Sequence, residues 1–443
     1  MTFARIDDAL SAFRRGELLV VVDDASRENE GDLIVAAEKA TPDALAFMVR
    51  HTTGIICTAI TRERADALEL PLMVQQNTDA HQTAFTVSVD LRNGTSTGVS
   101  AHDRSATIRA LIEPRTKPSD FTRPGHVFPL RAAPHGVLRR PGHTEAAVDL
   151  ARLSGLGDAG ALCEIVNDDG SMARLPQLTR FAAEHGLLIV SIADLIAHRQ
   201  RTETLVQRIS TARLPTPYGD FTIHVYRSPV DGLEHVALVR GELGLERGPM
   251  VRVQSECVTG EVFSSARCDC GEQLDGALAR IARDDCGAVI YLRGHEGRGI
   301  GLANKVRAYA LQDAGRDTVD ANIELGLPAD AREYACAASI LRDLGAAKVR
   351  LLSNNPRKAA ALDRLGIEVL ERLPLLVRPT AESLPYLKAK QHRFGHQLGI
   401  DTARAARSAR VAIAAPDAVD QQDVVLKAHS PAFAIAMKRK RVD

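Results

Sequence analysis

Three cysteines near the middle of the chain could bind a metal ion. Cys257, Cys268 and Cys270 are spaced C-x10-C-x-C in the stretch "SECVTGEVFSSARCDCGEQ". Thiolates are ligands that zinc prefers, and three protein ligands leave the fourth tetrahedral position open for a water that zinc activates near neutral pH. Two alternatives remain open. One is a closed structural zinc site with Cys286 or His295 as fourth ligand, and the other is three buried cysteines without metal.

A glycine-rich segment follows this cysteine cluster. In "RGHEGRGIGLANKVRAYALQ", Gly297, Gly299 and Gly301 would let backbone amides approach an anion at the start of a helix. A flexible turn is the alternative. Further on, Asp330 and Arg332 in "LPADAREYA" could act on a ligand or form a surface ion pair. The chain contains no G-x-x-x-x-G-K-[ST] motif, which excludes a P-loop ATPase.

A cluster of acidic residues lies near the amino terminus, in "DDASRENEGDLIVAA". Glu28, Glu30 and Asp32 lie beside Arg27 just before an apolar run. Clustered carboxylates repel one another unless a cation neutralises them, so a hard metal such as Mg²⁺ is expected. A solvated acidic turn is the alternative.

The segment "LRRPGHTEAAVDLA" has the groups that suit a phosphate. Arg140, Gly142, His143 and Thr144 combine a guanidinium, a permissive glycine and a hydroxyl at the start of a predicted helix. His143 could equally cap that helix. Glu164 follows an apolar strand, where a carboxylate is costly to bury unless it is paired or used.

The overall composition limits the classes of partner. Lys+Arg and Asp+Glu both total 56 in 443 residues, so no net field attracts nucleic acid or an anionic membrane. The first apolar run is short, so we expect neither a signal peptide nor a membrane span. A cytosolic, reducing location follows, in which the odd number of cysteines, 7, suits free thiols or a metal site.

The elements that must position these residues alternate between helices and strands. This alternation predicts an α/β (α+β) fold with two domains, each a mixed β-sheet covered by helices. Ile6, Leu10 and Phe13 form a helical stripe, and Thr41 is expected to cap a helix that begins at Pro42. The other elements expected in the first half are strands at 18–22, 33–36, 54–60, 160–166 and 187–192 and helices at 145–156, 175–186 and 193–203.

The periodic pattern lapses in the charged stretch 200–213, and a strand-rich segment begins after it. We therefore predict domains at 1–203 and 204–400. Residues 401–443 are rich in alanine with weak periodicity, which favours a largely disordered tail. The basic run Lys438–Arg441 is read as a solvated tail end, with an address or nucleic-acid patch as the alternative.

The second half resembles GTP cyclohydrolase II across about 205–400. The resemblance is carried by "VRVQSECVTGEVFSSARCDCGEQL", "YLRGHEGRGIGL", "RAYALQDAG", "DTVDAN", "PADAREY" and "VRLLSNNPRK". It implies that zinc on Cys257, Cys268 and Cys270 delivers water to C8 of guanine, which leaves as formate. It also implies that GTP, bound with Mg²⁺, loses pyrophosphate.

The same resemblance assigns individual residues. Tyr309 matches the catalytic tyrosine, Asp330 the proton acceptor and Arg332 the nucleophile. A guanidinium has a pKa above about 12 and offers only donors, so we expect Arg332 to stabilise charge on the α-phosphate instead. Gln254 and Ser353 replace the usual His and Thr but keep a hydrogen-bonding group. The implied GTP contacts are Arg252, Val253, Gln254, Ser255, Glu256, Gln273, Glu296, Gly297, Arg298, Thr318, Ser353 and Lys358.

The first half resembles 3,4-dihydroxy-2-butanone 4-phosphate synthase across about 1–200, through "RENEGD", "TAFTVSVD", "TGVSAHDR", "RPGHVFPLRA" and "RRPGHTEAAVDLARLSGL". This implies conversion of ribulose 5-phosphate to a four-carbon ketose phosphate plus formate, with two Mg²⁺ or Mn²⁺ ions on Glu28 and His143. Acid–base roles fall on His126 and Glu164, and His102 stands where a small residue is commoner. The implied substrate contacts are Arg27, Glu28, Asp32, Arg140, Pro141, Gly142, His143, Thr144 and Glu164.

Together the two resemblances imply a bifunctional, cytoplasmic enzyme of riboflavin biosynthesis, with the synthase in 1–203 and the cyclohydrolase in 204–400. Both families are homodimeric, so we expect a homodimer or a higher homo-oligomer. The alternatives are that one half is an inactive scaffold, or that the protein is a zinc-dependent regulator that binds guanine nucleotides. Formate release from GTP would separate an enzyme from a regulator.

Overall fold

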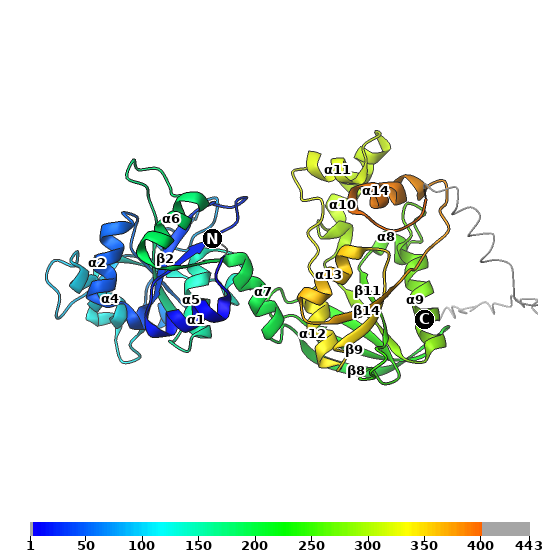
Figure 1. Cartoon of the computed structure of the whole chain (residues 1–443), viewed down its shortest axis with the longest axis horizontal. Helices are drawn as coiled ribbons and strands as arrows, with labels where there is room; N and C mark the ends of the chain where they lie inside the picture. Colours follow the sequence, from blue (N-terminus) through cyan, green and yellow to red (C-terminus); the bar gives the residue numbers. More distant parts are fainter. Residues whose placement is uncertain (1–2, 401–443) are drawn as a thin grey trace, which may run out of the picture. The chain divides into compact units, whose positions relative to one another are not determined.

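The computed structural model describes residues 3–400, so the predicted tail and its basic run lie outside the described residues. The described chain forms two seven-stranded mixed sheets with helices packed on their faces (Figure 1). This confirms the predicted fold class. Among residues 3–400, no helix is long and apolar enough to cross a membrane.

The first sheet has the strand order β4-β5-β3-β6-β2-β1-β7. The pairs β3–β5 and β1–β7 are parallel, and the other neighbours are antiparallel. Its strands are β1 (Leu19–Val22), β2 (Gly31–Ala36), β3 (Cys57–Ile60), β4 (Val89–Leu91), β5 (Phe121–Arg131), β6 (Ala159–Glu164) and β7 (Leu188–Ser191). The helices around it are α1 (Ile6–Arg15), α2 (Pro42–His51), α3 (Arg62–Ala67), α4 (Ala101–Ile112), α5 (His143–Leu153), α6 (Leu175–His185) and α7 (Ile192–Thr202).

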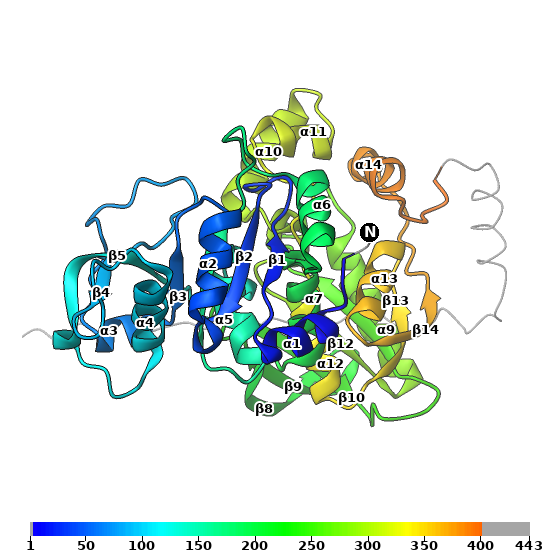
Figure 2. The same cartoon turned by 60° about the vertical axis from the view of Figure 1, so that its left-hand side comes forward.

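The central strands of the first sheet are covered on both faces, which explains why strands such as β1 (LVVV) are continuously apolar. Val20 and Val22 pack into one core with α2, α4 and α6, whereas Leu19 and Val21 pack into another with α1, α5 and α7 (Figure 2). Helix α2 begins as predicted, since the Thr41 hydroxyl accepts a hydrogen bond from the backbone amide of Ala44 at 3.2 Å.

The second sheet has the order β14-β13-β11-β12-β10-β9-β8. Its first four strands are mutually parallel, and the pairs from β12 to β8 are antiparallel. The strands are β8 (Gln207–Thr216), β9 (Gly219–Arg227), β10 (Glu234–Arg240), β11 (Met250–Ser255), β12 (Gly287–Leu292), β13 (Lys348–Leu352) and β14 (Glu368–Leu373). The helices are α8 (Val258–Glu261), α9 (Cys270–Asp284), α10 (Leu302–Asp313), α11 (Thr318–Glu324), α12 (Ala335–Asp343), α13 (Pro356–Arg364) and α14 (Leu384–Phe394).

The parallel strands of the second sheet bring its chemical motifs to one edge. Ser255 at the end of β11 is in register with Leu292 at the end of β12, and β13 lies on the other side of β11. The carboxyl ends of parallel strands are where open α/β sheets bind ligands. The cysteine loop, the glycine-rich loop and the segment "SNNPRK" each begin there.

Helix α7 ends at Thr202, close to the predicted end at 203. The predicted start of the strand-rich segment after 213 was wrong, because β8 already begins at Gln207. Strand β8 lies at the edge of its sheet and most of its residues are exposed, so it lacks the apolar alternation that marks a buried strand. The domain boundary at 203/204 falls between these two elements and stays a prediction.

Candidate active sites

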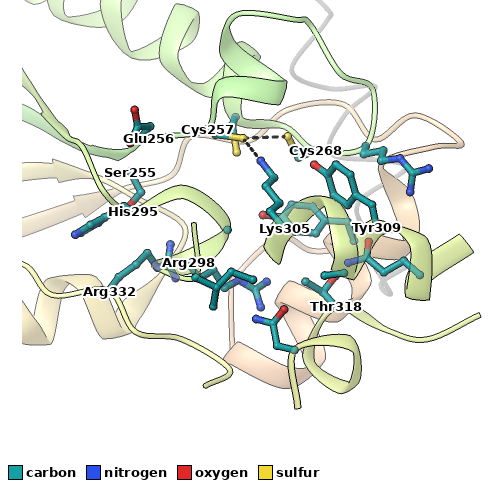
Figure 3. A pocket seen from close by; sticks show the side chains of 18 residues that line it. Ser255, Glu256, Cys257, Cys268, His295, Arg298, Lys305, Tyr309, Thr318 and Arg332 are labelled. Atoms are coloured by element: carbon teal, nitrogen blue, oxygen red, sulfur yellow. Dashed lines mark hydrogen bonds between the residues drawn. The ribbon is translucent and has the colours of Figure 1, made fainter. Parts of the chain in front are cut away.

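The three cysteines of the second half come together between α8 and α9. Their Sγ atoms all lie within 4.8 Å of one another, and those of Cys257 and Cys268 are 3.7 Å apart (Figure 3). Two thiolates on a tetrahedral zinc with bonds of about 2.3 Å would be separated by about 3.8 Å. The donor set and its spacing therefore fit a zinc ion.

Gly260 in α8 packs directly against this thiol cluster. A Cβ atom at this position would lie 2.7 Å from the Sγ of Cys268 and 3.2 Å from that of Cys257. The first distance is shorter than real Cβ contacts and the second is unusually tight, so a larger residue at this position would push against the cluster.

The candidate fourth ligands are held elsewhere. The thiol of Cys286 donates to the carbonyl oxygen of Glu242 at 2.8 Å, and His295 Nδ1 lies 3.2 Å from the Ser255 hydroxyl. Within residues 3–400, no further His, Cys, Asp or Glu side chain joins the three sulfur atoms. The geometry thus favours a cluster with one open coordination position over a closed one.

Lys305, on α10, is a neighbour of the thiols that the sequence reasoning missed. Its ammonium donates to Cys257 Sγ at 3.1 Å (Figure 3). It also donates to Thr259 Oγ1 at 2.7 Å and to Glu296 Oε1 at 2.5 Å. Spacing could have revealed it, because Lys305 precedes Tyr309 by one helical turn. The Tyr309 hydroxyl lies 3.1 Å from the same Thr259 hydroxyl.

The environment of the cluster favours a charged Cys257 thiolate and neutral side chains at Tyr309 and His295. Hydrogen bonds from Cys268 and Cys270, together with the charge of Lys305, hold the pKa of the Cys257 thiol far below its usual range. Burial raises the pKa of Tyr309, which therefore stays a hydrogen-bond donor at neutral pH. Burial also lowers the pKa of His295 to about 3, which keeps that imidazole neutral.

The thiols open into a cavity of about 640 Å³. Cys257 and Cys268 lie on one side of it and Arg298 and Arg332 on the other (Figure 3). The sequence-predicted residues on its wall are Ser255, Glu256, Cys257, Cys268, Cys270, Gly297, Arg298, Tyr309, Thr318 and Arg332. Lining residues that the sequence reasoning did not name include Arg267, Lys305, Asn322 and Tyr386.

Several predicted GTP contacts lie behind this wall. Arg252 donates to Gln273 Oε1 at 2.6 Å and to Gln254 Oε1 at 2.8 Å. Lys358 donates to the carbonyl oxygen of Val253 at 2.7 Å. These residues are buried with Ser353, and none of them lines the cavity.

The predicted pair Asp330 and Arg332 forms a two-point ion pair. The Arg332 guanidinium donates to the two carboxylate oxygens at 2.8 and 2.5 Å, and only Arg332 lines the cavity. Although burial opposes it, this pairing raises the pKa of Arg332 above its already high value. Arg332 therefore remains a fixed positive charge.

The glycine-rich loop needs glycine for its backbone geometry. Gly297, Gly299 and Gly301 have φ angles of 59, 92 and 83°, in the region that other residues rarely adopt. The loop turns sharply between β12 and α10 and carries Arg298 into the cavity.

A second cluster of ligand atoms lies in the first half, between β1, β2 and α5. Oxygen or nitrogen atoms of Asp23, Glu28 and His143 lie within 4.8 Å of one another. Asp23 was missed, although it directly follows the apolar strand β1. Its carboxylate accepts hydrogen bonds from the backbone amides of Glu28 at 3.0 Å and Glu30 at 2.9 Å, which fixes the acidic loop.

Two buried atoms, one in this cluster and one in the neighbouring Asp32, lack a hydrogen-bond partner in the described chain. They are Nε2 of His143 and Oδ1 of Asp32. Burial raises the pKa of Asp32 to about 7. Burial also acts to raise the pKa of Glu28, but the hydrogen bond with His143 and the charge of Arg27 bring it down to about 2. Unsatisfied buried ligand atoms are what a cation or a polar substrate would complete.

The cluster faces a cavity of about 540 Å³. Glu164 is held there by a hydrogen bond from the backbone amide of Ile55 at 2.8 Å. A Cβ at Gly142 would lie 2.4 Å from Nη1 of Arg140, so a glycine at this position leaves room for the Arg140 guanidinium. Pro141 precedes this glycine at the start of α5. The predicted residues on the cavity wall are Arg27, Glu28, Asp32, Arg140, His143, Thr144 and Glu164.

The structure does not bring His126 to this cavity wall. Its Nδ1 lies 2.7 Å from Oδ2 of Asp90, and 48% of the side chain is exposed. His102 is also exposed, with Nδ1 3.8 Å from Oδ1 of Asp103. The predicted acid–base role of His126 stays a prediction.

Comparisons with known proteins agree with the two halves. Residues 7–198 match the family 3,4-dihydroxy-2-butanone 4-phosphate synthase, and residues 207–374 match GTP cyclohydrolase II. The chain is 58% identical to riboflavin biosynthesis protein RibBA of Salinispora arenicola over 400 residues, covering 90% of this chain and 95% of the relative. It is 55% identical to bifunctional riboflavin biosynthesis protein RIBA 1, chloroplastic, of Arabidopsis thaliana, covering 90% of this chain and 74% of that protein.

A solved structure is similar over most of the chain. The two-domain 3,4-dihydroxy-2-butanone 4-phosphate synthase RibBX of A. baumannii superposes with a TM-score of 0.62 at 37% identity. The match covers 83% of this chain and 99% of that one.

We predict that Gly260→Ala weakens Zn²⁺ binding at the thiol cluster by at least about tenfold, because the new methyl group must displace a ligand sulfur. The measurement is competition with a chromophoric chelator. Gly276→Ala in α9 is the matched control, since its Cβ would meet only a leucine methyl group at 3.4 Å. Equal zinc affinity in both variants would contradict the packing argument.

Proposed function

This chain belongs to the family of bifunctional riboflavin biosynthesis proteins, and from that premise we propose how its two sites divide the work. The protein is both a 3,4-dihydroxy-2-butanone 4-phosphate synthase and a GTP cyclohydrolase II. We assign ribulose 5-phosphate to the cavity at Glu28 and His143, and GTP to the cavity at the thiol cluster. The domains are assigned to 1–203 and 204–400.

One observation carries the assignment of the GTP site: the three clustered thiols share a cavity with the guanidinium groups of Arg267, Arg298 and Arg332. A zinc ion on Cys257, Cys268 and Cys270 would supply activation of water near neutral pH. Removal of C8 from guanine as formate is a hydrolysis, so the site needs water and proton donors but no redox group. The arginine side of the cavity then receives the triphosphate, which binds with Mg²⁺.

The chain's own residues supply the remaining parts. Tyr309 offers a neutral phenol beside the thiols, where it can donate a proton or hydrogen bond to a guanine nitrogen. Arg332, oriented by Asp330, stabilises negative charge on the α-phosphate while pyrophosphate leaves. The proton-acceptor role of Asp330 stays a prediction.

In the first half we propose that Glu28 and His143 hold Mg²⁺ or Mn²⁺, two ions per site, with Asp23 as an added candidate ligand. Divalent cations would supply charge that stabilises enediolate oxygens of the sugar. Arg140 and Thr144, at the start of α5, suit the substrate phosphate. Glu164, held by the backbone of Ile55, is placed to move a proton.

The alternatives of an inactive half or a regulator are not favoured, since both halves match enzyme families and each places a group of its predicted residues on a cavity wall. A homodimer or higher homo-oligomer and a cytoplasmic location stay predictions.

The two activities should be separable, because no predicted site residue is shared between the halves. Cys268→Ser replaces a soft ligand by a poor one and should lower formate release from GTP by at least about a hundredfold, leaving ribulose 5-phosphate conversion intact. Glu28→Gln should do the reverse by removing a carboxylate charge. Product assays with each substrate separately, in the presence of Zn²⁺ and Mg²⁺, measure both effects.

The matched controls are Cys336→Ser, outside the thiol cluster, and Glu38→Gln, on the exposed surface. Both should keep both activities. Loss of both reactions in either test variant, while circular dichroism shows folded protein, would mean that the sites are coupled or shared.

Arg332 is expected to act through its charge. Arg332→Lys keeps a cation but loses the two-point contact with Asp330, so we expect GTP turnover to fall about tenfold to a hundredfold without loss of zinc. Steady-state kinetics and metal analysis measure these effects. A covalent guanylyl adduct on Arg332, trapped and detected by mass spectrometry, would contradict this role.

A further inference from the structure

Helix α14 reaches the GTP cavity although it lies beyond the part of the chain that matches the GTP cyclohydrolase II family, residues 207–374. Tyr386, near its start, is part of the cavity wall. The helix contacts α11, as Figure 1 shows. None of the sequence-predicted site residues lies on it.

The Arg298 guanidinium packs against aromatic rings of α14. The guanidinium carbon of Arg298 lies 4.1 Å from the centre of the Phe394 ring and 5.8 Å from that of Tyr386. Arg298 is only 8% exposed, and neither of its terminal nitrogens makes a hydrogen bond within the described residues. A guanidinium whose face is stacked on a ring keeps its edge free for a two-point contact with an anion.

A buried ion pair holds the middle of α14 against residues 268–270, here called the cysteine turn. Lys390 donates to Oδ1 of Asp269 at 2.7 Å, and the two side chains are 11% and 3% exposed. Asp269 lies between Cys268 and Cys270, and its other oxygen accepts from Gln273 Nε2 at 2.5 Å. A buried ion pair is costly to break, so it fixes the helix against the turn.

Two further contacts hold this segment to α11 and to the loop after β13. Arg393 pairs with Asp317 at 3.2 Å and with Asp320, at the start of α11 beside Thr318. The backbone amide of Gln397 donates to the carbonyl oxygen of Asn354 at 2.9 Å, in the loop after β13. The segment 384–397 thus touches the cysteine turn, the glycine-rich loop, α11 and the loop after β13.

We propose that α14 is part of the GTP site. The Phe394 ring packs on the face of the Arg298 guanidinium and leaves the edge of that guanidinium free to bind the triphosphate. Lys390 holds the helix against the cysteine turn through its ion pair with Asp269. Phe394 and Lys390 are positioning residues, because they act through Arg298 and Asp269. The inference rests on the proposed function for the identity of the ligand, since an unpaired guanidinium alone specifies only an anion.

The test is equilibrium binding of a non-hydrolysable GTP analogue, guanosine 5′-[β,γ-imido]triphosphate, to the full chain loaded with Zn²⁺ and Mg²⁺. Phe394→Leu should raise its Kd about 3- to 30-fold, as loss of a cation–π contact implies, and should raise the KM for GTP similarly. Phe394→Tyr keeps the ring and should restore an affinity within about twofold of the parent protein.

Lys390→Met should raise the same Kd at least about fivefold, because it leaves Asp269 buried without its partner. Lys388→Met is the matched control, an exposed lysine on the same helix, and should bind the analogue like the parent protein. Ribulose 5-phosphate conversion should persist in all four variants.

Unchanged affinity in Phe394→Leu would overturn the inference, as would equal losses in Phe394→Leu and Phe394→Tyr or in Lys390→Met and Lys388→Met. These outcomes differ from failure of the proposed function. If the parent protein binds the analogue but releases no formate from GTP, the assigned activity fails, while the binding series still decides the role of α14.

Discussion

Buried charge that needs an opposite partner determines the layout of both sites. In the second half, the Lys305 ammonium lies among Cys257, Thr259 and Glu296, where it compensates a thiolate and a carboxylate at once. Without such a cation, a buried thiolate would be protonated and a poor metal ligand. The thiol cluster, the glycine-rich loop that carries Glu296 and the helix that carries Tyr309 therefore depend on one another.

The two cavities are charged in opposite ways. Around the GTP cavity, Arg298, Arg332 and Arg267 exceed the carboxylates on its wall, which suits a triphosphate. In the other cavity, Glu28, Glu30, Asp32 and Glu164 exceed the arginines, which suits divalent cations. A chain without net charge thus creates two strong local fields, and each selects a different kind of ligand.

The sequence predicted the parts of this structure that depend on short-range pattern. The alternation of helices and strands, the cap at Thr41 and the cysteine spacing all led to elements that the structure contains. Edge strand β8 could not be recognised, because an exposed strand carries no apolar period. Tyr386 was missed because its place on the cavity wall arises from contacts between distant segments. Asp23 and Lys305 were missed although each had a local signal, a position directly after an apolar strand for Asp23 and one helical turn before Tyr309 for Lys305. Arg252 and Lys358, predicted as ligand contacts, are held by internal hydrogen bonds and do not line the cavity, so their contact with GTP stays a prediction.

We propose that the second half holds zinc on three thiolates with one position left open, and X-ray absorption at the zinc edge tests this arrangement most directly. It predicts three sulfur neighbours at about 2.3 Å and one light atom. It also predicts the same spectrum for His295→Ala, since that imidazole contacts Ser255 instead of the cluster. Four sulfur neighbours, or a light-atom shell that changes in His295→Ala, would show a closed site and contradict the account.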